Sequence, residues 1–228
     1  MLVLGIETAT PICAVALWSD GHLLAENRCR AKSRHGEIIA GMIEYIFELL
    51  QLDTGDLNGV AVSKGPGSFT GLRIGMSMAK ALAYSHKIPI VGVSTPDAIA
   101  SGIAPVADRL AVVLPSRKGE VYAAPYRYLD GFYHREGGIE ALPIEEFESW
   151  AEKIRYVAGP GIPALIEAGI NRKTFLPDIF WEVGAAPVAR MGARKLLAGE
   201  QDDLSSLEPD YVKPFFTTAK PKKWAEPV

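Results

Sequence analysis

Residues 2–28 read LVLGIETATPICAVALWSDGHLLAENR, and this stretch decides the fold class. It holds three apolar runs of strand length, separated by short turns at residues 8–11 and 20–21. Because the turns are tight, we expect three antiparallel neighbours, with the first run as a buried central strand. The predicted strands are Leu2–Ile6, Ile12–Trp18 and His22–Arg28.

A helix, a strand, a helix, a strand and a helix are predicted to follow. Ser33 is a good N-cap for the first helix, Glu37 suits the positive end of its dipole, and the helix ends near Leu50. Thr95 and Pro96 open the third helix. Three strands before the first helix are typical of the α/β half-unit of actin-like and ribonuclease-H-like folds, whereas a Rossmann domain begins βαβ. The other predicted elements are strands at 58–63 and 88–93, and a second helix that ends near residue 85.

The second half of the chain repeats this order faintly. A Gly-Pro-Gly segment at 159–161 follows a short predicted strand, as Gly-Pro-Gly at 65–67 does in the first half. We therefore predict two lobes from a degenerate duplication, residues 1–105 and 106–205, and a tail, 206–228, that is either free or returns to the first lobe. The alternative is chance, since Gly and Pro cluster after strands in many folds. The predicted elements are strands at 110–114, 120–128, 132–135 and 155–158, and helices at 144–153 and 186–198.

Composition and charge narrow the function classes. The 228 residues are 48% hydrophobic and 22% charged, which suffices for a real core. A formal net charge of −3 argues against the chain gripping nucleic acid alone. No apolar run approaches the ~18 residues that span a bilayer and no basic-then-apolar leader is present, so we expect a cytoplasmic protein with no membrane partner.

Cys13 and Cys29 fall opposite each other across the predicted hairpin, as two thiols or as a disulfide.

The segment KGPGSFTGLRIG, residues 64–75, places glycines and two hydroxyls between a predicted strand and a helix. Free backbone N–H groups and the helix dipole favour a phosphate at such a junction. No Gly-Lys-Ser or Gly-Lys-Thr closes the loop, so it is not a Walker A loop. The other interpretation is that the glycines allow a tight turn and close packing of helix on sheet. The residues that would contact phosphate are Gly65, Gly67, Ser68 and Gly71.

Three segments resemble the TsaB (YeaZ) family: GPGSFTGLRIG at 65–75, LGIETAT at 4–10 and GEVY at 119–122. The segment Glu208–Lys213 is similar to the family's closing Pro-x-Tyr-Leu-Arg. Members of this family are the smaller, non-catalytic paralogues of the threonylcarbamoyl transferase TsaD, and both belong to the actin-like ATPase (ASKHA) superfamily. The resemblance therefore implies an actin-like fold of two lobes.

The resemblance also implies a function in the machinery that installs threonylcarbamoyladenosine (t6A) in tRNA. The chain would dock on TsaD and activate it, and the two would recruit the ATPase TsaE. Together they would modify the adenosine beside the anticodon in ANN-decoding tRNAs. tRNA would then be contacted only through the complex, and this chain would require no cofactor.

In catalytic members of the superfamily, the acid of the first strand helps to hold a metal-bound nucleotide. Glu7 stands at that position, beside Thr8, where the family usually has Asp. A second departure is Pro115-Ser116-Arg117, where the family usually has Asp-Ala-Arg. The resemblance thus marks Glu7 and Thr8 as nucleotide-binding candidates, and weak binding of ATP or ADP stays open.

The sequence offers no catalytic and no metal-binding residue. TsaD binds its metal through two histidines four residues apart on the first helix, a spacing that puts both on one face. None of the four histidines here is four residues from another; His35 has Ile39 at that position, and we expect it at the surface. No Gly-x-Ser-x-Gly segment supplies a nucleophile. The alternatives are an autonomous nucleotide-dependent transferase or kinase of a small molecule, and a homodimeric structural protein.

The first two long helices are more apolar than a helix on a sheet requires. At ~100° per residue, the apolar residues of the first helix cover roughly 200° of its circumference, and a core-facing stripe needs about 100°. Small residues four apart in the second helix form a flat seam for another helix. We therefore predict a surface for TsaD and for a homodimer here; the alternative is that the second domain covers it. The predicted residues are Met42, Ile46, Gly71, Gly75, Met78, Ala79 and Leu82.

The tail mixes basic and aromatic residues in an otherwise acidic chain. Such a mixture suits contact with RNA through phosphate pairing and base stacking. A solvated tail is the alternative. The residues are Lys213, Phe215, Phe216, Lys220, Lys222, Lys223 and Trp224.

Overall fold

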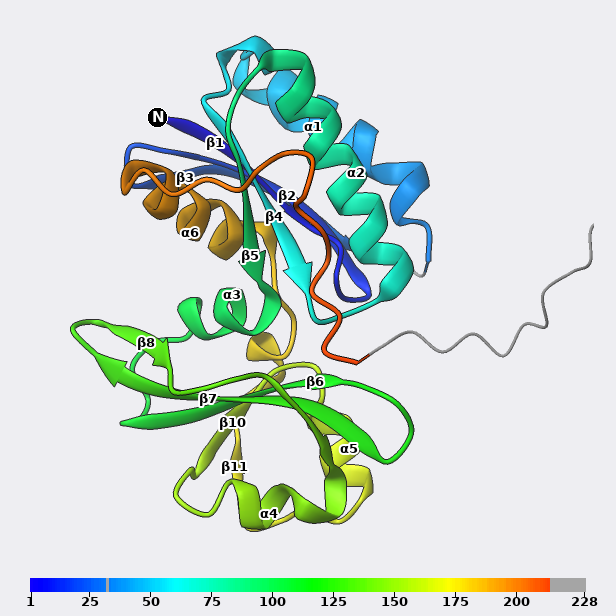
Figure 1. Ribbon diagram of the computed structural model, residues 1–228, viewed down its shortest axis with the longest axis vertical. Helices are drawn as coiled ribbons and strands as arrows, with labels where there is room; N and C mark the ends of the chain where they lie inside the picture. Colours follow the sequence, from blue (N-terminus) through cyan, green and yellow to red (C-terminus); the bar gives the residue numbers. More distant parts are fainter. Residues whose placement is uncertain (32, 214–228) are drawn as a thin grey trace, which may run out of the picture.

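The first lobe is a five-stranded sheet with helices on both faces (Figure 1). The computed structural model describes residues 1–31 and 33–213. The predicted order of three strands followed by alternating helices and strands is confirmed. The elements are β1 (Leu2–Glu7), β2 (Ile12–Ser19), β3 (His22–Arg30), α1 (His35–Leu50), the 3-10 turn η1 (Thr54–Asp56), β4 (Gly59–Gly65), α2 (Phe69–His86), β5 (Ile90–Ser94) and α3 (Thr95–Ser101).

The strand order of the first sheet is β3-β2-β1-β4-β5, with β1 buried at the centre. The hairpin turns make β2 antiparallel to both β1 and β3, whereas β4 and β5 reach parallel positions through α1 and α2. Cys13 is paired directly with Cys29 across β2 and β3, as the hairpin predicts. Both are free thiols, Cys13 buried and Cys29 exposed, and burial raises the pKa of Cys13 to about 12.

The second lobe repeats the first. Five strands of its sheet have the order β8-β7-β6-β10-β11, which matches the first sheet in order and direction, and a sixth, β9, pairs with β7 and has no counterpart there. The predicted duplication is thereby confirmed in the topology. The elements are β6 (Arg109–Pro115), β7 (Glu120–Leu129), β8 (Phe132–Arg135), β9 (Glu140–Pro143), the 3-10 turn η2 (Ile144–Glu146), α4 (Phe147–Trp150), β10 (Tyr156–Ala158), α5 (Ile162–Glu167), β11 (Thr174–Phe175), the 3-10 turn η3 (Asp178–Phe180) and α6 (Ala185–Leu197).

The helix predicted at residues 144–153 is wrong in length. Only the turn η2 and the single helical turn α4 form, and the chain then reverses at Ala151. The reversal brings Ile154 into the same apolar cluster as Phe147 and Ala151. The strands β9 and β11 and the helix α5 were not predicted, because two to six residues are too few to show a period.

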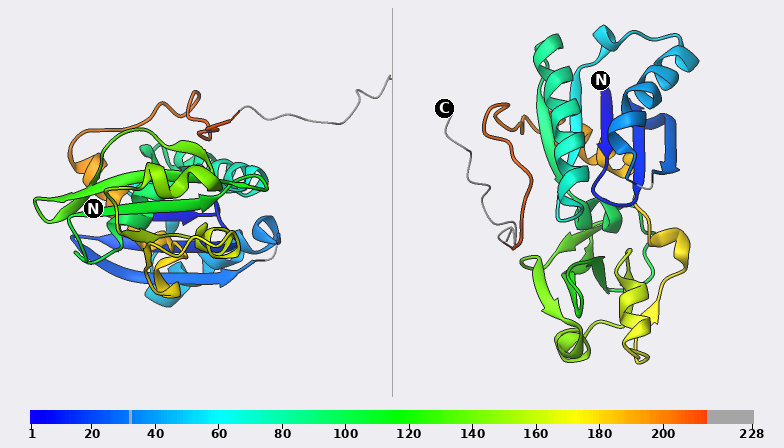
Figure 2. Two further views of the ribbon diagram at one scale, coloured as in Figure 1. Left: turned by 90° about the horizontal axis from the view of Figure 1, so that it is seen from below. Right: turned by 90° about the vertical axis from the view of Figure 1, so that its right-hand side faces the viewer.

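Two helices fill the layer between the sheets, one from each lobe. α3 packs on β6 and β8 of the second sheet, and α6 packs on β1, β2 and β4 of the first (Figures 1 and 2). The predicted boundaries assign residues 185–197 to the second lobe, but α6 covers the first sheet. α6 packs closely on the first sheet because a glycine on each side of the contact leaves room for the approach. A Cβ on Gly5 would lie 2.6 Å from the backbone of Ala189, and a Cβ on Gly192 would lie 2.2 Å from the side chain of Ala61.

The chain after α6 returns to the first lobe and runs along α2 (Figure 2). Asp202 forms a bridge with Ile90, the N–H of Asp210 donates to the carbonyl of Lys64, and Lys213 pairs with Glu120 of β7. Among the described residues, no helix combines the length and apolar character that crossing a bilayer requires. The rest of the basic and aromatic tail, residues 215–224, lies outside the described residues.

Candidate functional site

The glycine-rich loop closes against the turn between β1 and β2. The N–H of Ser68 donates to the carbonyl of Ala9 at 2.7 Å, and the Ser68 hydroxyl accepts from the N–H of Gly71. A Cβ on Gly67 would lie 2.3 Å from the carbonyl oxygen of Ala9. The structure therefore brings the predicted phosphate-binding residues together, but packs them against protein backbone.

Thr8 extends this contact into α2. Its hydroxyl donates to the carbonyl of Gly71 at 2.8 Å, and Cβ atoms on Gly71 and Gly75 would lie 2.1 Å and 2.2 Å from Thr8 oxygens. Gly65, at φ +115°, lies under the carbonyl of Asp210, to which a Cβ would come within 2.8 Å. Glycine at these positions lets helix, turn and C-terminal segment meet backbone to backbone.

Glu7 is enclosed at the end of β1, with no exposed surface. Its carboxylate accepts from the Ala9 N–H at 2.7 Å and from the Ser63 hydroxyl of β4. Burial raises the pKa of Glu7 from 4.5 to about 7, against the opposing effect of hydrogen bonds from Ser63 and from the backbone of Ala9 and Thr10. The carboxylate thus fastens the turn between β1 and β2 to β4 from within the core.

His35 corrects a prediction, because it is buried rather than at the surface. Its Nε2 lies 3.0 Å from the carbonyl oxygen of Thr10 and 3.3 Å from that of Ile12. Since carbonyl oxygens only accept, Nε2 carries the proton and donates. His35 therefore joins the start of α1 to the same turn that the glycine-rich loop contacts.

Most of the predicted partner surface lies in the core, and this part of the prediction is wrong. α1 and α2 turn their small and apolar residues toward the sheet, where Gly71 and Gly75 meet Thr8. Met78 and Leu82 are half-buried, packed against the edge of that core. The buried residues are Met42, Ile46, Gly71, Gly75 and Ala79.

The outer face of the same two helices carries a different apolar surface. α1 and α2 lie side by side on the outside of the first lobe (Figure 1), and a groove of about 600 Å³ runs between them. Tyr45, Leu49 and Tyr84 on the same helices are 56%, 60% and 77% exposed. The groove is lined by Gly36, Ile39, Phe69, Thr70, Arg73, Ile74, Ser77, Met78 and Ala81.

One end of the groove meets the returning C-terminal segment. The ring of Tyr211 lies 5.2 Å from that of Phe69, and the Arg73 guanidinium lies 4.0 Å from the Phe69 ring. Arg73 also donates to the Tyr211 hydroxyl at 3.3 Å. The sequence pattern missed this cluster, although Tyr211 stands in the closing segment that resembles the TsaB family.

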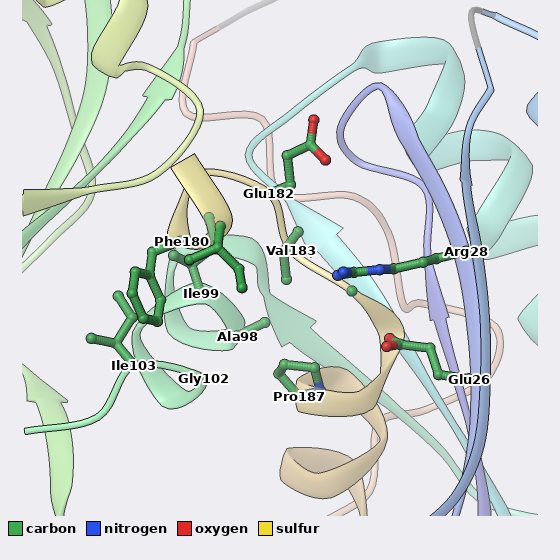
Figure 3. A pocket seen from close by; sticks show the side chains of 12 residues that line it. Glu26, Arg28, Ala98, Ile99, Gly102, Ile103, Phe180, Glu182, Val183 and Pro187 are labelled. Atoms are coloured by element: carbon green, nitrogen blue, oxygen red, sulfur yellow. The ribbon is translucent and has the colours of Figure 1, made fainter. Parts of the chain in front are cut away.

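A smaller pocket, of about 280 Å³, lies between β3, α3 and the start of α6 (Figure 3). Glu26 and Arg28 project from β3 over the start of α6. Glu26 accepts from the N–H of Ala186 at 2.9 Å and so caps α6. Because Glu182 also lines this pocket, its charges are mixed and no single ligand class is favoured. Within residues 1–31 and 33–213, no cluster of three potential metal ligands occurs.

Comparison with known proteins agrees with this architecture. The family model for TsaD, tRNA N6-adenosine threonylcarbamoyltransferase, matches residues 29–192. The solved structure of YeaZ from Pseudomonas aeruginosa superposes with a TM-score of 0.82 at 23% identity, covering 92% of this chain and 99% of that one. The ethanolamine utilization protein EutJ from Carboxydothermus hydrogenoformans reaches a TM-score of 0.50 at 13% identity, with 84% and 90% coverage. The fold is the two-lobed actin-like ATPase fold.

Two curated relatives define the family more closely. The tRNA threonylcarbamoyladenosine biosynthesis protein TsaB of Escherichia coli K12 is 39% identical over 162 residues, 70% of this chain and 68% of that protein. The TsaB protein of Bacillus subtilis 168 is 26% identical over 220 residues, 93% of this chain and 94% of that protein. This chain therefore belongs to the TsaB (YeaZ) family.

Proposed function

We propose that the chain acts in the biosynthesis of threonylcarbamoyladenosine in tRNA, as a non-catalytic subunit that docks on a TsaD-type transferase and activates it. The assembled enzyme, with the ATPase TsaE, would modify the adenosine beside the anticodon in ANN-decoding tRNAs. Family membership supports the pathway, since the curated relatives are named for it. The groove between α1 and α2 supports the docking.

The groove supports the docking because the described part of the chain closes only one end of it, where Tyr211 packs on Phe69 and Arg73. It is lined mainly by apolar side chains, and the exposed rings of Tyr45 and Tyr84 lie on the same two helices. Contiguous apolar surface rimmed by polar residues marks a protein interface. The second lobe, which we considered as a cover, lies beyond α3 and α6, on the opposite side of the first sheet from α1 and α2 (Figure 1).

Charge favours pairing of α1 of one subunit with α2 of a related subunit. α1 carries Glu44 and Glu48 on exposed positions, and Glu37, which pairs with Arg34, whereas α2 carries Arg73 at the groove. Two copies related by a two-fold axis would set α1 of one against α2 of the other, with opposite charges facing. A TsaD-type partner of the same fold would offer the corresponding helices. We therefore propose a homodimer for the free chain and a heterodimer with the transferase.

We further propose that this chain requires no nucleotide and performs no catalytic step. The glycine-rich loop has no room for a phosphate beside Gly67, because the carbonyl of Ala9 lies there and takes the N–H of Ser68. The Glu7 carboxylate is enclosed and already bonded. An autonomous nucleotide-dependent transferase or kinase would need both groups free, so the geometry favours the partner role.

Ala81→Glu tests the docking surface. Ala81 is exposed and lines the groove, so the fold should tolerate the change, while an unpaired charge in a closed interface costs several kcal/mol. We expect the variant to lose co-elution with the TsaD-type protein of the same organism and to lose t6A formation in the reconstituted reaction. Ala168→Glu, exposed at the end of α5, is the matched control. Full binding by Ala81→Glu, at an unchanged melting temperature, would remove the groove from the interface.

A further inference from the structure

A second large pocket, of about 540 Å³, lies between α6, α3 and the hairpin of β7 and β8. α6 and this hairpin flank α3 on the same side of the molecule (Figure 1). It is a surface separate from the groove between α1 and α2. Four cations and two carboxylates, Asp97 and Glu200, line the pocket, so its lining is net positive although the whole chain has a net charge of −3. The residues that carry the argument are Phe132, His134, Arg135, Arg190, Arg194 and Lys195.

Of these cations, only Arg135 is paired with a carboxylate in the described part of the chain. Asp97 accepts from the Tyr126 hydroxyl at 2.6 Å and pairs with Arg135 at 3.6 Å. Arg190 instead donates to the carbonyl of Ser101, and Lys195 to a backbone carbonyl at 3.4 Å. Carbonyl oxygens satisfy hydrogen-bond donors but carry no full negative charge.

The positive charges therefore act on one another. In the described part of the chain, no carboxylate lies within ion-pair distance of Arg190, Arg194 or Lys195. Burial, and then the neighbouring charge of Arg194, lower the pKa of Arg190. A bound anion would remove this repulsion.

An aromatic ring holds one of the cations in place. The Arg194 guanidinium lies 4.2 Å from the centre of the Phe132 ring, which is 42% exposed on the hairpin. Stacking on a ring fixes the plane of the guanidinium and leaves its edge free to donate to phosphate oxygens. Separated cations beside an exposed aromatic ring are the combination with which proteins hold the backbone and bases of single-stranded nucleic acid.

We propose that this pocket binds the phosphodiester backbone of RNA. The inference rests on the proposed function, because the RNA expected at this site is the tRNA that the assembled transferase modifies. Because the chain as a whole is acidic, we expect this pocket to add a local contact while the partner supplies the larger share of the positive surface.

Charge reversal in the full-length chain tests the proposal. The double variant Arg194→Glu, Lys195→Glu replaces two cations of the pocket, and binding of a fluorescein-labelled tRNA transcript is followed by anisotropy between 50 and 200 mM salt, a range over which loss of phosphate contacts is readily measured. We expect the affinity to fall at least about tenfold and the slope of log K against log salt to decrease by about two. A double reversal far from the pocket, Arg155→Glu with Arg172→Glu, makes the same change in net charge and should alter neither quantity. Equal losses in both variants, or no binding of RNA by the natural chain at 50 mM salt, would overturn the assignment.

Two further experiments distinguish RNA from other ligands of the pocket, and the RNA site from the proposed function. If ATP displaces the RNA at equal phosphate concentration, the pocket takes a nucleotide and the RNA assignment fails. If the pocket variant no longer co-elutes with the TsaD-type partner while it still binds RNA, the pocket is a protein contact and the assignment also fails. If the natural chain does not co-elute with that partner, the proposed function fails, while anisotropy on the isolated chain still decides the RNA site.

Discussion

Replacing Glu7 with Gln should change how the stability of the protein depends on pH. Gln has nearly the same shape, and its amide can accept from the Ala9 N–H and donate to the Ser63 hydroxyl, so the contacts of the buried carboxylate are kept. What the substitution removes is the titrating proton. The pH dependence of the free energy of unfolding should therefore differ between the natural protein and the variant only through the titration of Glu7.

The direction of the pKa shift of Glu7 decides whether its titration raises or lowers the free energy of unfolding as the pH rises. The pKa of Glu7 rises from 4.5 to about 7 on folding, so between these values the folded state holds more protons than the unfolded state. The free energy of unfolding of the natural protein should then fall as the pH rises through this window. A shift of this size corresponds to about 3 kcal/mol, which is the most that Glu7 can remove above pH 7.

Urea unfolding of both proteins between pH 4.5 and 8 measures the effect. The difference in free energy of unfolding, Glu7→Gln minus natural, should grow by up to about 3 kcal/mol across this range and level off above pH 7. Taking the difference cancels every other titrating group, and Glu44→Gln, an exposed carboxyl on α1, controls for the loss of a surface charge. A difference that stays constant with pH would refute the reasoning, because Glu7 would then have the same pKa in both states.

Two further predictions concern the glycine-rich loop and its surroundings. Gly75→Ala should destabilise the protein by about 1–3 kcal/mol, because its Cβ would meet the Thr8 hydroxyl; Gly41→Ala, with open space at its Cβ in α1, should stabilise it by about 0.5–1 kcal/mol in the same urea titration. Calorimetry at millimolar ATP or ADP with Mg²⁺ should give no heat of binding to the isolated chain, and a saturable isotherm would contradict the closed geometry of the loop.

The strand order of the first lobe was predictable because its hairpin turns leave few alternatives. The short turns after β1 and β2 force antiparallel neighbours, and a parallel strand after a helix can join only the open edge at β1. The second lobe was harder to predict because the missed strands β9 and β11 are four and two residues long. Strands this short are defined by their hydrogen-bonding partner rather than by their own pattern.

The prediction of a partner surface shows where sequence reasoning stops. The apolar residues of α1 and α2 cover more of each helix than one buried face requires, but their periodicity does not tell which face meets the sheet. Two glycines decide which face of α2 meets the sheet. Only a residue without Cβ lets α2 approach Thr8, so the seam of Gly71 and Gly75 turns inward. The half-buried Ile74 and Met78 then line the outer groove. The sequence predicted both helices correctly, but the face of α2 that turns inward is set by its contacts with the residues at the end of β1.

The repeat of Gly-Pro-Gly in both lobes bears on what these glycines do. In the second lobe the N–H of Gly161 donates to the carbonyl of Val113, and a Cβ on Gly159 would lie 2.3 Å from the same oxygen. The first lobe makes contacts of the same kind one to two residues later in the segment: the N–H of Ser68 donates to the carbonyl of Ala9, and a Cβ on Gly67 would lie 2.3 Å from that oxygen. A backbone N–H group that already donates to the carbonyl of Ala9 or Val113 is not free to donate to a phosphate. Since both lobes make a backbone contact of this kind, close packing accounts for these glycines without a bound phosphate.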